Sequence, residues 1–322
     1  MTETKQRVAV TRLIPSIGLQ LLEEHFEIEQ WQSDAPPDKE TLTRLLQHKD
    51  GALTLLSDQI DSELLDQCPE LKIIGNMAVG YENIDPDAAA ERGVWVSNTP
   101  DVLTDATADI AMSLILSVTR RIVESDKFMR AGKYHYWEPR MLRGSGLADK
   151  TLGIIGFGRI GKAVAHRAKA FGMKILFTDP VAEETSDAER VELDELLSRS
   201  DIVSLHCPYS DDLFHLIDAV AFRRMKKNSY FINTARGKLM DEKALVNALR
   251  EEEIAGAGLD VYENEPAFEQ ELAGFDNVVM LPHIGSATHE TRDAMATLAA
   301  KNIIEVLLGR DPLTPVNKPR NT

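Results

Sequence analysis

Four residues with complementary chemistry follow short apolar runs in the C-terminal half of the sequence. They are Arg236, the two carboxylates Glu263 and Glu265, and His283. A histidine held as an imidazolium by a carboxylate can give its proton to a carbonyl oxygen that gains negative charge. An arginine presents a planar fork that binds a carboxylate through two hydrogen bonds. The set therefore suits the reduction of a 2-keto acid by hydride transfer.

A glycine-rich turn follows the apolar run 151–155. It reads Gly156-x-Gly158-x-x-Gly161, and an amphipathic helix is predicted over 160–171. The first glycine permits a tight turn, the second lets backbone N–H groups approach a pyrophosphate, and the third lets helix and strand pack closely. The pyrophosphate then binds at the positive N-terminus of the helix. The turn predicts a dinucleotide site.

Asp179 indicates which dinucleotide binds. It ends the next apolar run, 18 residues after Gly161, close to the spacing of about 20 residues for the acid that binds the adenosine ribose. A carboxylate there accepts hydrogen bonds from the ribose hydroxyls and repels a 2′-phosphate. No basic residue follows until Arg190. We therefore expect NAD(H) to be preferred over NADP(H).

Other histidines and cysteines have simpler interpretations. His206 follows the apolar run 202–205 and is expected to line the cofactor pocket, whereas His166 lies inside a helix and is expected at the surface. Cys207 is expected to be a buried, inert thiol. A single histidine or arginine after a strand is more often structural, but several such residues on one sheet edge beside a nucleotide turn favour a functional site.

Short apolar runs alternate with amphipathic stretches along most of the chain, a pattern typical of parallel α/β architecture. Strands are predicted at 8–11, 52–56, 71–75 and 94–97, and in a second series at 151–155, 174–178, 202–205, 229–233, 257–260 and 278–281. Helices are predicted at 16–24, 105–129 and 287–308. Ligands of open α/β sheets bind beyond the carboxyl ends of the strands, and this edge carries Arg236 and His283.

Length and composition limit the possible functions. The 322 residues correspond to about two domains. With 36 basic and 52 acidic side chains the formal net charge is −16, which disfavours binding to nucleic acid or to anionic membranes. No apolar stretch approaches the ~20 residues of a membrane span, and two cysteines fit a reducing compartment. We expect a cytoplasmic protein without a metal site.

Several motifs together resemble one family. Gly156–Gly161 with Asp179, the segment 233–237, the segment 258–261 with Glu265-Pro266, and the segment 282–285 are similar to the D-2-hydroxyacid dehydrogenases. The resemblance implies that Arg236 anchors the substrate, that His283 is the acid/base, and that Glu265, rather than Glu263, is its partner. Residues 98–105 and 282–288 are most similar to the glyoxylate/hydroxypyruvate reductase branch.

The resemblance also implies the fold and the binding residues. It implies an α/β protein with two Rossmann-like domains, in which an NAD-binding domain (102–288) is inserted into a smaller flavodoxin-like substrate domain (1–101 and 289–322). The implied cofactor residues are Gly156, Gly158, Arg159, Ile160, Gly161, Asp179, His206, Thr234, Ala235, Asp260, Gly285 and Thr107. The implied substrate residues are Val79, Gly80, Leu56, Ser57 and Trp137. Trp137 would reach the pocket of the partner subunit of a homodimer, or alternatively pack in an aromatic loop.

The expected function is NAD(H)-dependent reduction of glyoxylate or hydroxypyruvate. Two alternatives remain open. The same chemistry could act on 2-ketogluconate or 3-phosphohydroxypyruvate, or the chain could be a non-enzymatic NAD-sensing scaffold like the corepressors that resemble this family. The presence of Arg236, Glu265 and His283 together favours the enzyme.

Overall fold

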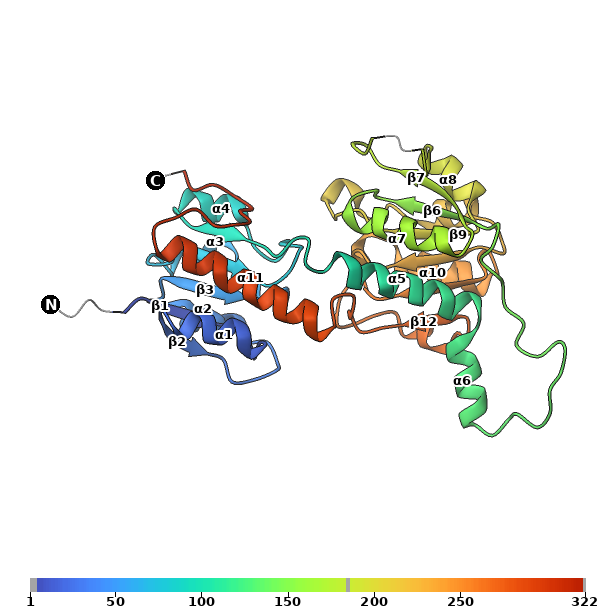
Figure 1. Cartoon of the computed structure of the whole chain (residues 1–322), viewed down its shortest axis with the longest axis horizontal. Helices are drawn as coiled ribbons and strands as arrows, with labels where there is room; N and C mark the ends of the chain where they lie inside the picture. The colour runs from blue at the N-terminus through green and yellow to red at the C-terminus, as the bar shows by residue number, and fades with distance from the viewer. Residues whose placement is uncertain (1–4, 184–185, 321–322) are drawn as a thin grey trace. The chain divides into compact units, whose positions relative to one another are not determined.

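A computed structural model describes residues 5–183 and 186–320 of the chain (Figure 1). The chain forms two compact units, one built from residues 1–103 together with 287–322 and the other from residues 104–286. Each unit contains its own parallel sheet with helices packed against it. No helix within the described residues is long and apolar enough to cross a membrane.

The second unit is built on a seven-stranded sheet whose order is β12-β11-β10-β9-β6-β7-β8. All of its strand pairs are parallel. Its strands are β6 (Thr151–Ile155), β7 (Lys174–Thr178), β8 (Glu189–Arg190), β9 (Ile202–Leu205), β10 (Tyr230–Asn233), β11 (Gly256–Leu259) and β12 (Val278–Met280). In chain order within the unit, this is the doubly wound dinucleotide-binding order 3-2-1-4-5-6 with one further strand at the end. The order reverses between β6 and β9.

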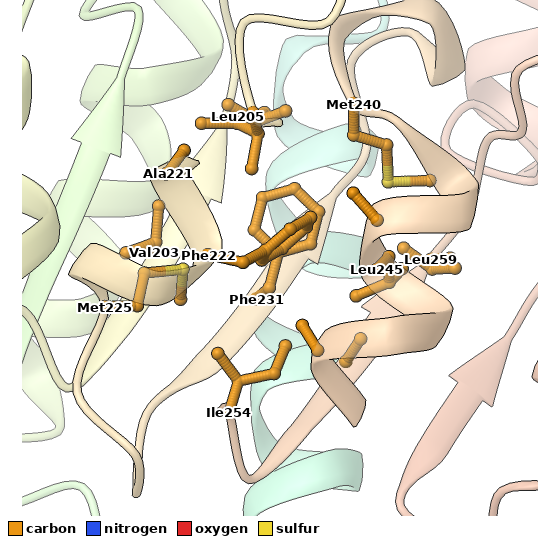
Figure 2. Close-up of a cluster of buried hydrophobic side chains, with 14 of the residues drawn as sticks. Val203, Leu205, Ala221, Phe222, Met225, Phe231, Met240, Leu245, Ile254 and Leu259 are labelled. Carbon is orange, nitrogen blue, oxygen red and sulfur yellow. The ribbon is translucent and has the colours of Figure 1, made fainter. Parts of the chain in front are cut away.

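Helices cover both faces of this sheet. They are α5 (Thr104–Thr119), α7 (Arg159–Ala170), α8 (Leu193–Arg199), α9 (Ala219–Arg224) and α10 (Glu242–Arg250). Helix α6 (Ile122–Arg130) follows α5 and has no buried residue. The unit also contains the short 3-10 turns η1 (Asp211–Leu213), η2 (Gly237–Leu239) and η3 (Gln270–Gly274). One apolar core lies between the sheet and α8, α9 and α10, and another lies under α5 and α7. In the first core Phe222 packs edge-on against Phe231, with ring centroids 5.3 Å apart (Figure 2). The two apolar cores hold the strands in place and so position the loops that follow them.

The first unit contains a five-stranded parallel sheet of order β2-β1-β3-β4-β5, the flavodoxin-like order. Its elements are β1 (Arg7–Val10), α1 (Ser16–Glu23), β2 (Glu27–Gln30), α2 (Lys39–Leu46), β3 (Gly51–Thr54), α3 (Ser62–Asp66), β4 (Ile73–Asn76), α4 (Pro86–Glu91), β5 (Trp95–Ser97) and α11 (His289–Leu307). The C-terminal helix α11 packs on this sheet. A Cβ at Gly75 would lie 2.9 Å from Ile303, so α11 approaches the strand closely.

The predicted fold class is confirmed, but one predicted helix was wrong in extent and two strands were not predicted. The predicted helix 105–129 is two helices, because Arg121 adopts a left-handed conformation (φ 54°) between α5 and α6. Strands β2 and β8 were missed. Both carry polar residues and are largely exposed at sheet edges, so neither shows the apolar run by which the other strands were recognised.

Candidate active site

The loops that follow β6, β7, β9, β10, β11 and β12 all leave the seven-stranded sheet at its carboxyl edge, because the strands are parallel. Arg236 follows β10, Glu265 lies in the loop after β11, and His283 lies three residues after β12. The glycine turn follows β6 at the point where the strand order reverses. The structure therefore brings the predicted catalytic residues and the predicted dinucleotide turn to one edge of one unit.

His283 and Glu265 form a direct pair. The Nδ1 atom of His283 lies 2.8 Å from Oε2 of Glu265, and each side chain is 34% exposed. The other carboxylate oxygen, Oε1, accepts a hydrogen bond from the backbone N–H of Tyr262 (2.9 Å). Burial raises the pKa of Glu265, but hydrogen bonds from His283 and Tyr262 and the charge of Arg236 outweigh it, so the pKa lies below its usual value. Glu265 is therefore an anion at neutral pH.

Asp260 holds the backbone on which His283 sits. His283 has a φ of 54°, a left-handed conformation that is uncommon for residues other than glycine. Its N–H donates to the carbonyl of Asp260 (2.9 Å). The buried Asp260 carboxylate accepts from the N–H groups of Ile284 and Gly285, both at 2.7 Å. Burial raises the pKa of this carboxyl group above its usual value. These bonds keep a strained residue in one conformation.

The turn that carries Arg236 is fixed by the fully buried side chain of Asn233. Its Oδ1 accepts from the N–H of Ala235, and its Nδ2 donates to the carbonyl of Arg236, both at 3.0 Å. The guanidinium is half-buried and donates to the carbonyl of Ala235 (2.7 Å). Its charge also reaches Glu265, whose pKa it lowers. The positive charge of Arg236 therefore acts on the same carboxylate that contacts His283.

The glycine turn has the close contacts that its residue types require. Gly156 has a φ of 90°, and a Cβ there would lie 2.3 Å from the backbone N of Cys207. A Cβ at Gly161 would lie 2.2 Å from the carbonyl oxygen of Gly156. At Gly158, the residue before α7, a Cβ would lie within 4 Å of none of the described residues apart from its chain neighbours. Close backbone contacts therefore exclude a side chain at Gly156 and at Gly161. Gly158 instead faces open space in front of the N-terminus of α7, and this space suits a pyrophosphate.

Asp179 lies beside this turn, at the end of β7. Its Oδ2 accepts from the N–H of Phe157 (2.7 Å), and its Oδ1 accepts from Val181 (2.9 Å) and Ala182 (2.8 Å). Burial opposes ionisation, but the three backbone donors place the pKa of Asp179 below its usual value. A carboxylate has about four lone-pair sites. Asp179 therefore organises the turn and can still accept a further hydrogen bond.

Buried polar atoms without protein partners among the described residues mark further cofactor candidates. They include Nδ1 of His206 and Oγ1 of Thr234. Burial lowers the pKa of His206 to about 3, so its ring is neutral, and Nε2 lies 2.8 Å from Oγ of Ser204. Thr107 of α5 lies next to Gly285, where a Cβ would be 3.5 Å from the threonine side chain. Unsatisfied polar atoms and the glycine cradle together fit a dinucleotide.

The predicted substrate residues do not follow the strands of the seven-stranded sheet. Leu56 and Ser57 follow β3, and Val79 and Gly80 follow β4, so these four residues share the carboxyl edge of the five-stranded sheet. The carbonyls of Val79 and Gly80 accept from Asn98 (2.8 Å) and Asn76 (2.9 Å), respectively. Across residues 5–183 and 186–320, neither of their N–H groups donates to a protein acceptor. Trp137 lies in the segment after α6 and is 73% exposed.

Sequence reasoning missed some of the residues that hold the site. Asn233 and Asp260 lie within motifs that indicated a function, but the hydrogen bonds from their side chains to the loop backbone were not predicted. Glu242, a buried carboxylate at the start of α10, carried no recognised signal.

Burial raises the pKa of the Cys207 thiol to about 11, which keeps it protonated at neutral pH. In the part of the chain that the structure describes, no cluster of three or more metal-ligating side chains occurs.

Comparisons with known proteins agree with this geometry. Residues 112–285 match the D-isomer specific 2-hydroxyacid dehydrogenase, NAD binding domain. The glyoxylate reductase of Thermococcus litoralis is 49% identical over 322 residues, 98% of this chain and 97% of the relative. The crystal structure of the TT0316 protein from Thermus thermophilus has a TM-score of 0.93 and 40% identity, covering 97% of this chain and 100% of that one. The NADPH-dependent glyoxylate/hydroxypyruvate reductase of Sinorhizobium meliloti, solved with NADP and malonate, has a TM-score of 0.85 and 32% identity, covering 97% of each chain. The chain therefore belongs to the D-isomer specific 2-hydroxyacid dehydrogenase family.

Proposed function

We propose that this protein reduces small 2-keto acids to 2-hydroxy acids with NADH, and that glyoxylate and hydroxypyruvate are its first substrates. Family membership makes the chain an oxidoreductase with a nicotinamide cofactor. The observation that carries the proposal is the 2.8 Å contact between His283 and Glu265 at the edge that also presents Arg236 and the glycine turn. The relatives named glyoxylate reductase support this choice of substrates.

In this proposal each side chain has one role. A nicotinamide cofactor held at the Gly156–Gly161 turn would supply a hydride to the carbonyl carbon. His283 donates a proton to the carbonyl oxygen as negative charge develops there, and the anionic Glu265 stabilises the protonated ring and fixes its orientation. Arg236 binds the substrate carboxylate as a planar fork. In the first unit, Val79 and Gly80 are the proposed backbone N–H donors to substrate, and Leu56 and Ser57 are its further proposed contacts.

A panel of keto acids tests the proposed function. Full-length protein is mixed with NADH or NADPH and with glyoxylate, hydroxypyruvate, 2-ketogluconate or 3-phosphohydroxypyruvate, and cofactor oxidation is followed by absorbance. We expect glyoxylate and hydroxypyruvate to give the highest kcat/KM. A higher kcat/KM for either larger acid would support the same reaction with a different substrate. No oxidation with any acid, despite NADH binding, would instead favour an NAD-sensing scaffold.

The preference for NADH is proposed from Asp179. An anion at the ribose end of the turn repels the 2′-phosphate of NADPH, and like charges in contact cost several kcal/mol. The NADP-bound Sinorhizobium meliloti enzyme shows that the family also uses the phosphorylated cofactor. The carboxylate of Asp179, already organised by three backbone donors, is the main support for NAD(H).

Replacing Asp179 with asparagine is expected to reduce the ratio of kcat/KM for NADH to that for NADPH by about 10-fold or more. Asparagine removes the charge and keeps one acceptor oxygen for the N–H groups of Val181 and Ala182, but its amide nitrogen faces the N–H of Phe157. The ratio between the two cofactors is therefore the readout, because a loosened turn would lower both values of kcat/KM. The matched control is Asp187→Asn, which removes an exposed charge paired with Lys169 in the same segment. An unchanged ratio in Asp179→Asn, or a wild-type enzyme that favours NADPH, would contradict the assignment.

The homodimer is also a proposal. It is supported by the exposed aromatic side chains of Tyr134, Tyr136 and Trp137, which are 46%, 69% and 73% exposed in the segment after α6. Burial of such side chains between subunits would remove apolar surface from water. Light scattering is expected to give twice the 35.8 kDa mass of the chain. A monomer at assay concentration would remove the role proposed for Trp137.

A further inference from the structure

We propose that Glu242 is a positioning residue, whose buried carboxylate ties the loop carrying Glu265 to the segment carrying Arg236 and so sets the geometry of the Glu265–His283 pair. This inference rests on the proposed function of that pair. The carboxylate of Glu242 binds the backbone of the loop between β11 and η3, and it acts on the pair through that backbone.

The contacts of Glu242 lie on both sides of Glu265. The side chain is only 3% exposed. Its Oε1 accepts from the backbone N–H of Glu263, and its Oε2 accepts from the backbone N–H of Glu269 at 2.8 Å. These donors lie two residues before and four residues after Glu265. A single carboxylate therefore closes the loop that presents the partner of His283.

The position of Glu242 in the chain links this loop to the arginine. Glu242 is the first residue of α10 and follows Arg236 by six residues, with the short turn η2 between them. The positive end of α10 favours a carboxylate there. The backbones also meet directly, because a Cβ at Gly237 would lie 1.8 Å from the carbonyl carbon of Tyr262. A displaced loop would therefore change the position of Glu265 relative to Arg236.

Tyr262 passes the constraint on to both members of the pair. Its N–H, one residue before the donor at Glu263, binds Oε1 of Glu265 at 2.9 Å. Its hydroxyl donates to the carbonyl of Leu281 at 2.9 Å, two residues before His283. On the far side of the loop, the carboxylate of Glu263 lies 3.1 Å from Nε2 of His215. The loop backbone that Glu242 holds is thus the frame for the 2.8 Å contact between His283 and Glu265.

The chemistry of a carboxylate explains why glutamate serves here. An ionised carboxylate has only acceptors, so both of its oxygens can meet an N–H. A glutamine of the same shape has one acceptor oxygen and one amide nitrogen, which would face an N–H donor with another donor. A buried donor left without a partner is costly. Glu242→Gln therefore loosens one end of the loop while changing the side-chain volume little.

The test compares Glu242→Gln with the full-length wild-type enzyme. We expect kcat for glyoxylate reduction to fall about 10-fold to 100-fold, with NADH binding by fluorescence titration unchanged within about twofold. We also expect activity to be lost sooner as the pH falls, because a loosened loop weakens the hydrogen bonds from His283 and Tyr262 that hold the pKa of Glu265 below its usual value. Glu242→Asp, which keeps two acceptor oxygens, should recover part of kcat and of the pH profile.

The matched control is Glu271→Gln, which removes an exposed carboxylate from η3 that pairs with Arg250. It should leave kcat and the pH profile unchanged. Wild-type kcat and pH profile in Glu242→Gln would overturn the proposal, and so would loss of NADH binding in step with kcat, since Glu242 would then support the whole unit. If Glu242→Gln does not fold, the same readouts on Glu242→Asp decide. Failure of the proposed function would appear separately, as an inactive wild type.

Discussion

Replacing His283 with asparagine is expected to lower kcat for keto-acid reduction by about 10²-fold to 10⁴-fold, the usual contribution of a positioned general acid. Asparagine can occupy the strained left-handed backbone that His283 adopts (φ 54°), so the loop held by Asp260 should survive. It has an amide that donates hydrogen bonds but releases no proton near neutral pH. The loss should therefore appear in the proton-transfer step rather than in the fold.

The structure gives a reason why His283 is suited to this role. Its partner Glu265 has a pKa below the usual value, because hydrogen bonds from His283 and Tyr262 outweigh the effect of burial. A group with a lowered pKa keeps its stabilising contact above its ordinary pKa and loses it only as the pH falls through the lowered value. The carboxylate is thus available to the imidazolium across the neutral range, where the proton must be donated.

Steady-state kinetics with glyoxylate and NADH, together with NADH binding by fluorescence, measure the effect. The control is His166→Asn, which replaces an exposed histidine on α7. The control should match the wild type, and the affinity of His283→Asn for NADH should stay within about twofold. Near-normal kcat in His283→Asn would remove the acid/base assignment, whereas loss of NADH binding would assign His283 to the cofactor site.

The edge on which these residues meet could be predicted from the sequence because it depends on local signals. The glycine turn requires Gly156 and Gly161 for close backbone contacts, and these contacts are present. Residues directly after parallel strands must lie at the carboxyl edge, which places Arg236 and His283 together. The choice between two acids in the loop after β11 came from the family resemblance. In the structure Glu265 contacts His283, whereas Glu263 contacts His215.

The supports of the site could not be predicted in the same way. The contacts of Glu242 with the loop after β11 span 21 and 27 residues, and those of Asp260 with Ile284 and Gly285 span 24 and 25. Hydrogen bonds from a side chain to a distant backbone leave no period and no spacing in the sequence. Patterns of apolar residues reveal which strand a loop follows, but not which carboxylate holds the loop in place.

Replacing Arg236 with glutamine is expected to lower kcat/KM for glyoxylate by about 10²-fold or more, because removing one partner of a hydrogen-bonded charge pair costs about 2–5 kcal/mol or more. Arg236→Lys should lose less, since an ammonium keeps the charge but not the two parallel N–H donors. If kcat/KM falls from the wild type to Arg236→Lys and falls again to Arg236→Gln, both the charge and the planar geometry of the guanidinium contribute to substrate binding. KM for NADH should change little in either variant.

The effect on pH dependence separates anchoring from a structural role. The charge of Arg236 lowers the pKa of Glu265, so its removal should raise that pKa and weaken activity first at acidic pH. Arg224→Gln removes an exposed charge on α9 that is paired with Asp194 and should change neither kcat/KM nor its pH profile. If Arg236→Gln keeps wild-type kcat/KM, Arg236 does not anchor the substrate carboxylate. An equal loss of kcat/KM for glyoxylate and for NADH would instead indicate that the turn held by Asn233 has lost its structure. Loss of a substrate anchor alone would lower kcat/KM for the keto acid and leave that for NADH unchanged.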